Sequence, residues 1–144
     1  MKPLFTGLML ILFSLSLFTA CKKDDDDNEA STNKMSVTID GTKWESTGYE
    51  INLSTNGSLS TIIATGANNT QIYLAFQGSA GSTDLVAAVY TEDANACSAN
   101  PTSAQLTITR MGTGNDVAGT FSFNGICATG GSKSLTSGSF DFGN

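Results

Sequence analysis

The 144-residue sequence contains no histidine and few basic residues. Histidine is the base of Ser-His and Cys-His nucleophile systems and a frequent zinc ligand, so its absence excludes those arrangements and leaves carboxylates and tyrosines for any catalysis. Seven Lys and Arg stand against 13 Asp and Glu, a net charge of −6. Nucleic-acid binding requires clustered basic groups. We therefore expect no nucleic-acid partner, and nothing in the sequence indicates a cofactor or a resident metal.

The sequence also lacks an apolar run long enough to cross a membrane. The best candidate, residues 4–18, has 15 residues, whereas a spanning helix needs roughly 20. Lys2 precedes this run, and Thr19 and Ala20 follow it directly before Cys21. A charged start, a short apolar stretch and a small-residue exit are typical of a secretory signal peptide. We predict that residues 1–20 are removed.

The exit site resembles the lipobox of bacterial lipoproteins, in which the cysteine carries the lipid. Thr19 and Ala20 fit that pattern, while Phe18 stands where the lipobox usually has leucine. The resemblance implies that Cys21 is lipidated and becomes the first residue of the mature chain. Two or more acyl chains hold a protein stably on a membrane. The alternative is an ordinary signal peptide followed by an incidental cysteine.

A polar, acidic segment follows the cysteine and ends at residue 33. It has no large apolar side chain, so we predict a flexible tether whose 12 residues span at most about 40 Å. Its first half resembles the export signal of surface lipoproteins of the Bacteroidota type. The residues concerned are Lys22, Lys23, Asp24, Asp25, Asp26 and Asp27. The resemblance implies an outer-membrane protein exposed at the cell surface; a solubilising spacer is the alternative.

The sequence has three cysteines, one predicted to carry lipid and two available for a disulfide. If Cys21 carries lipid, Cys97 and Cys127 remain as an even pair in an oxidising compartment. A bridge across their 30-residue separation would stabilise the fold by roughly 3–4 kcal/mol. We predict this disulfide, which requires Cα atoms within about 7 Å.

Residues 34–144 have the length of one domain and a period-two pattern. Ile72, Leu74 and Phe76 alternate with their neighbours, for example, and Asp40-Gly41 is a turn signal. About eight short strands predict an all-β fold, a single antiparallel β-sandwich or a lipocalin-like barrel. Residues 91–101 form the longest stretch without strand character. We predict a loop there and would look there first for a ligand.

Two segments near the end of the chain echo each other. Residues 119–124 (GTFSFN) and 138–143 (GSFDFG) each open on glycine and place two Phe on one face, which predicts neighbouring strands sharing one core face. Residues 35–44, 106–109, 119–123 and 137–140 look like a family of small Bacteroidota lipoproteins of uncharacterised function. The resemblance covers nearly all of the domain. It implies an all-β secreted domain and no catalytic residue.

Four residues are candidate ligand contacts: Trp44, Tyr90, Glu92 and Asp93. Trp44, the only tryptophan, suits either a sugar-stacking platform or the core, and core packing is favoured. Glu92 and Asp93, with Asp84 and Asn95, offer oxygen ligands to Ca²⁺. No Asp-x-Asp-x-Asp-Gly loop is present, so a solvated acidic turn is favoured.

These observations lead to three functional hypotheses. The first is a lipid-anchored, non-enzymatic surface domain that binds a glycan, peptide or protein. The second is a lipocalin-like carrier of a small apolar ligand, with an enlarged cavity walled by Phe121, Phe123, Phe140 and Phe142. The third is a hydrolase with two facing carboxylates. A filled core with exposed aromatics would favour glycan binding, and a dry cavity would favour the carrier.

Overall fold

The computed structural model describes residues 32–54 and 56–143, which form ten β-strands and no helix. The all-β prediction is confirmed, with two strands more than expected. No helix that could cross a membrane occurs within these ranges. Cys21 and the predicted export signal, residues 22–27, lie outside the described residues. The strands are β1 Lys34–Ile39, β2 Thr42–Glu45, β3 Gly48–Asn52, β4 Ser60–Thr65, β5 Gln71–Ser79, β6 Ser82–Glu92, β7 Asn95–Ala99, β8 Gln105–Met111, β9 Val117–Cys127 and β10 Ser132–Phe142.

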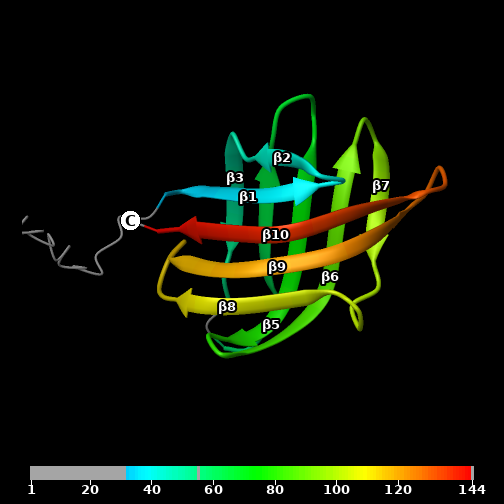
Figure 1. Cartoon of the computed structure of the whole chain (residues 1–144). Coiled ribbons are helices and arrows are strands. Elements are labelled where there is room, and N and C mark those ends of the chain that lie inside the picture. Colours follow the sequence, from blue (N-terminus) through cyan, green and yellow to red (C-terminus); the bar gives the residue numbers. More distant parts are fainter. Residues whose placement is uncertain (1–31, 55, 144) are drawn as a thin grey trace, which may run out of the picture.

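The strands form one antiparallel sheet that curls into two layers. Its order is β2-β1-β10-β9-β7-β6-β5-β4-β3, and β8 also pairs with β9. In Figure 1, β1, β10, β9 and β8 lie side by side in front and run across the layer that contains β3, β5 and β6. The strands at the two ends of this order, β2 and β3, are consecutive in the chain. Ser46 N–H donates to Met35 O (2.8 Å) on one side, and Thr47 N–H donates to Thr65 O (2.7 Å) on the other.

β7 and β8 lie on the same side of β9, one after the other along its length. β7 pairs with the end of β9, from Cys97↔Cys127 to Ala99↔Gly125, and β8 resumes at Gln105↔Ser122. The predicted loop at residues 91–101 is therefore wrong. β6 continues to Glu92, a turn follows, and β7 begins at Asn95. β7 has the sequence NACSA, without β-branched or aromatic residues, so its pairing with β6 and β9 overrides a weak strand propensity.

The predicted disulfide between Cys97 and Cys127 is confirmed. The two Cα atoms are 3.8 Å apart, and both residues are buried. The bond joins β7 to β9 at directly opposed positions. It therefore fixes the short strand that the sequence pattern does not reveal.

The aromatic side chains of β9 and β10 fill the space between the layers. Phe121, Phe123, Phe140 and Phe142 are all buried, and successive ring centroids lie 6.1–6.3 Å apart. The two echoing segments pair as predicted, with Gly138 opposite Phe121 and Phe140 opposite Gly119.

Each glycine of that pair makes room for the opposing ring. A Cβ on Gly138 would lie 2.7 Å from the Phe121 ring, and a Cβ on Gly119 would lie 2.8 Å from Cζ of Phe140. The four phenylalanines thus belong to a filled core rather than to the walls of a cavity.

Candidate functional site

A hollow of about 350 Å³ lies at the end of the sheet where the β1–β2 turn, the β4–β5 turn, the end of β6 and the start of β10 meet. Three of the four candidate contacts line it: Trp44, Tyr90 and Glu92. Asp93 is not among its lining residues and occupies the exposed β6–β7 turn, with φ of 47°. The curl of the sheet thus brings together β2 and the end of β6, which are distant in sequence. We call this hollow the Tyr90 pocket.

Trp44 forms one wall of the Tyr90 pocket and is held in a fixed position. It is half-buried on β2 and packs against the core. Its indole N–H donates to Thr70 Oγ1 (2.8 Å), and the Thr70 hydroxyl donates to Ala67 O (2.7 Å). The ring lies so close to Gly66 that a Cβ there would come within 2.6 Å of Cε2. Because its one polar atom is already bonded, the indole offers the pocket only apolar surface.

Tyr90 forms the inner wall. It lies on β6 in register with Ile72 of β5 and Cys97 of β7, and only 3% of it is exposed. Its hydroxyl has no hydrogen-bond partner in the described part of the chain. No fully enclosed side-chain oxygen among these residues lacks a partner. The hydroxyl therefore reaches the surface of the pocket.

The pKa of Tyr90 is raised, first by burial and then by the charge of Glu92. Both effects disfavour the tyrosinate. The hydroxyl accordingly keeps its proton through the neutral range and is available both to donate and to accept a hydrogen bond.

The charged rim of the Tyr90 pocket consists of paired ions. Lys133 Nζ lies 3.1 Å from Glu92 Oε2 and 3.5 Å from Asp40 Oδ2, and the hydrogen bond to Glu92 is the main cause that raises the pKa of Lys133. The other oxygen of Asp40 accepts from the Ser134 N–H (2.9 Å). Lys43 pairs with Glu45 at 2.8 Å. Two lysines and two carboxylates line the pocket, so their formal charges cancel.

Sequence reasoning missed Asp40, Lys133 and Thr70. Asp40 looked only like a turn residue, and it does adopt the left-handed conformation, with φ of 48°. Lys133 is an isolated charge in a Ser-rich segment and belongs to no recognisable sequence motif. Only the pairing of β1 with β10 places these two residues together. No local signal in the sequence could have identified them.

Glu92 and Asp93 of the acidic turn were candidate Ca²⁺ ligands. Within residues 32–54 and 56–143, no three His, Cys, Asp or Glu side chains are grouped so as to hold a metal ion. Asn95, one of the Ca²⁺ candidates, instead accepts a hydrogen bond from Thr129 N–H (3.3 Å).

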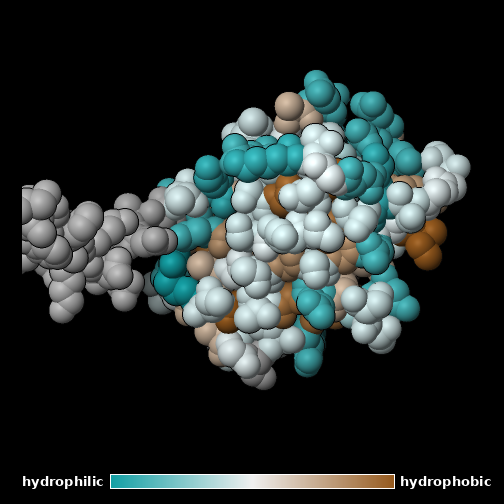
Figure 2. Space-filling model, viewed as in Figure 1, coloured by the Kyte–Doolittle hydropathy of each residue, from teal (hydrophilic) through white to brown (hydrophobic). Residues whose placement is uncertain are grey.

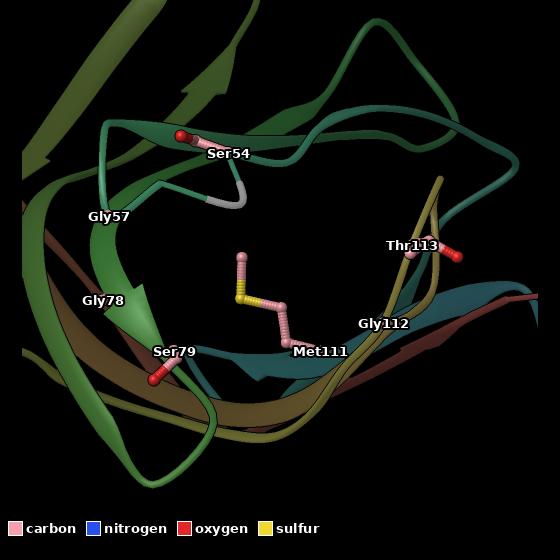
Figure 3. A pocket seen from close by; sticks show the side chains of 7 residues that line it. All are labelled: Ser54, Gly57, Gly78, Ser79, Met111, Gly112 and Thr113. Atoms are coloured by element: carbon pink, nitrogen blue, oxygen red, sulfur yellow. The ribbon is translucent and has the colours of Figure 1, made fainter.

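A second hollow, of about 500 Å³, lies at the other end of β5. Figure 3 shows the Met111 side chain pointing into it. Among the described residues that line it, Met111 is the only large apolar one. The other residues are small: Ser54, Gly57, Gly78, Ser79, Gly112 and Thr113. An apolar ligand there would meet one thioether and exposed backbone.

The front face of the molecule differs in polarity from strand to strand. Figure 2 shows hydrophilic residues gathered over β1 and β2, and residues of mostly intermediate hydropathy with some apolar ones over β9 and β10. On β1 and β2, Lys34 and Lys43 both form ion pairs with Glu45.

In comparisons with known proteins, no family model, curated protein or solved structure matches the chain.

Proposed function

We propose that this chain is a lipid-anchored protein of the outer membrane, exposed at the cell surface, whose β domain is a non-catalytic binding module. Its ligand is a polar extracellular molecule, and among glycans, peptides and proteins a glycan suits the Tyr90 pocket best. One observation carries this choice. Tyr90 is almost fully buried, yet its hydroxyl, which has no partner among the described residues, opens into a hollow walled by Trp44.

The size of the Tyr90 pocket favours a small unit over a folded partner. Ligand sites span roughly 300–1,000 Å³ and combine an apolar wall with a few well-placed polar groups. At about 350 Å³ the pocket lies at the lower end of that range. Stable protein–protein interfaces instead bury about 1,200–2,000 Å² and require a broad contact surface.

The position of the Tyr90 pocket suits a ligand that arrives from outside the cell. In Figure 1, the described chain enters β1 and leaves β10 on one side of the domain, and the β1–β2 turn lies on the other. Asn33 and Gly143 mark the first side, where Asn33 Oδ1 accepts from Gly143 N–H (3.0 Å). A tether attached there would turn the pocket away from the membrane.

A carrier of a small apolar ligand is the second candidate function, supported by the hollow around Met111. A hydrolase is less well supported. Asp40 and Glu92 do share the Tyr90 pocket, but Lys133 lies between them and pairs with both. A glycosidase instead needs one carboxylic acid as proton donor and the other free as base or nucleophile.

The binding proposal can be tested with the full-length protein extracted in detergent. A glycan array should show saturable binding, and organic extraction of the purified protein should yield no stoichiometric apolar ligand. A silent array would refute glycan binding, and a co-purifying lipid would favour the carrier.

The anchoring proposal is tested in cells. Cys21→Ser should move the protein from the membrane to the soluble fraction, and Asn in place of Asp24 to Asp27 should abolish its digestion by protease added to whole cells. A Cys21→Ser protein that stayed with the membrane would contradict lipid anchoring. Unchanged digestion of the Asn variant would contradict the export signal.

A further inference from the structure

The charged side chains around the Tyr90 pocket already form ion pairs with one another or with a neighbouring residue. Lys133 is bound by Glu92 and Asp40, and Lys43 is bound by Glu45. An anionic ligand would have to draw a lysine away from its carboxylates, and a cationic ligand would have to draw a carboxylate away from its lysine. These pairs are solvent-exposed, with 30–47% of the Lys133, Glu92 and Asp40 side chains accessible. A charged ligand that breaks one should therefore bind up to about fivefold more weakly than a neutral ligand that leaves it intact.

A neutral polyhydroxyl ligand needs no such separation. An ionised carboxylate has about four acceptor positions and an ammonium has three donors. The lining carboxylates and Lys133 thus retain capacity beyond their mutual bonds. A sugar hydroxyl both donates and accepts, so it can add to the ion pairs while they remain intact.

Tyr90 and Trp44 provide the other two elements of such a site. The Tyr90 hydroxyl lacks any partner within the described residues, so a ligand hydroxyl would supply its missing hydrogen bond. The bonded indole of Trp44, together with Ile39, gives an apolar wall for the C–H groups of a sugar ring.

We infer that the Tyr90 pocket binds one neutral sugar residue through the Tyr90 hydroxyl and the Lys133–Glu92–Asp40 ion pairs, and that it discriminates against charged sugars of either sign. This inference rests on the proposed function, since it specifies the glycan and the atoms that bind it.

Trp44 fluorescence provides the test, because Trp44 is the only tryptophan of the chain and lines the pocket. The full-length protein in detergent micelles is titrated with glucose, galactose, mannose and N-acetylglucosamine. The same titration is made with glucuronate, glucose 6-phosphate and glucosamine. At least one neutral sugar should change the emission saturably, and its charged derivatives should bind about two- to fivefold more weakly.

Tyr90→Phe removes only the hydroxyl and should weaken binding of that neutral sugar about tenfold, the value of one hydrogen bond. Tyr73→Phe makes the same chemical change on β5 outside the pocket and should leave binding unchanged. Because the Tyr90 hydroxyl has no partner among the described residues, Tyr90→Phe should keep the melting temperature of the parent. If the hydroxyl instead stabilised the fold, Tyr90→Phe would lower the melting temperature.

The inference is overturned if a charged sugar binds more tightly than its neutral parent, if no neutral sugar binds, or if Tyr90→Phe binds as the parent does. Glycan-array binding that survives Tyr90→Phe would refute this assignment while leaving the proposed function intact. An array that is silent for the parent protein would refute both.

Discussion

Removing the Cys97–Cys127 bridge should destabilise the domain more than most single changes would. The bridge closes a 30-residue loop. The chain-entropy model gives such a loop about 3.5 kcal/mol at room temperature. Domains of this size are stable by only about 5–15 kcal/mol, so the loss is a large fraction of the total.

The measurement compares the parent with the double variant Cys97→Ala/Cys127→Ala by urea unfolding, followed through Trp44 emission. The double variant should lose about 3–4 kcal/mol, and its melting temperature should fall by about 15 °C. The slope of the urea transition should also change, because the unfolded chain without the bridge is more expanded. Ser98→Ala is the matched control, since it lies between Cys97 and Ala99 on β7 and its side chain is exposed.

A difference below about 1 kcal/mol between the parent and the double variant would refute the reasoning, because it would mean that the bridge hardly restricts the unfolded chain. The reduced parent serves as a second check. It should unfold at nearly the same urea concentration as the double variant, because both have lost the same covalent constraint.

Three further predictions concern the core and the Tyr90 pocket. Phe142→Ala should lower the free energy of unfolding by about 3–5 kcal/mol, because Phe142 is fully buried. Leu59→Ala, at a 45% exposed position, should lower it far less. Equal losses for the two variants would contradict the packing described. Gly66→Ala should push the Trp44 ring outward, shifting its emission to longer wavelength and lowering stability; unchanged emission would contradict the close approach. The raised pKa of Tyr90 means that the unfolded chain loses this proton at lower pH than the folded one. Its contribution to stability is therefore complete below about pH 10 and is lost as the pH rises through the folded pKa. Tyrosinate absorbance of the parent minus that of Tyr90→Phe should show the late ionisation, and a difference curve centred at the ordinary pKa would contradict it.

The sequence predicted those features that arise from local pattern. Period-two alternation identified strands such as β5, and the GTFSFN and GSFDFG echo identified the pairing of β9 with β10. The even pair of cysteines predicted the disulfide. Each of these signals is carried by residue type and spacing along a short segment.

Features that depend on pairing between distant segments were not predictable in the same way. β7 has a weak strand propensity and is defined by its neighbours on both sides. Trp44, Tyr90 and Glu92 were singled out by chemistry, but only the curl of the sheet places them in one hollow. Their charged neighbours Asp40 and Lys133 meet because β1 lies beside β10.

The interrupted strand position shared by β7 and β8 marks a point where this domain tolerates insertion. Ala99 pairs with Gly125 and Gln105 pairs with Ser122. Between these two pairs lie residues 100–104 on one side but only residues 123 and 124 on β9. The extra residues form a mostly exposed turn closed by Asn100, whose carbonyl accepts from the N–H groups of Ser103 (3.0 Å) and Ala104 (3.1 Å). The disulfide holds the strand before this turn, and six registered pairs with β9 hold the strand after it. An epitope tag or fluorophore placed here would leave the register on both sides unchanged and provide a handle for detecting the protein on intact cells.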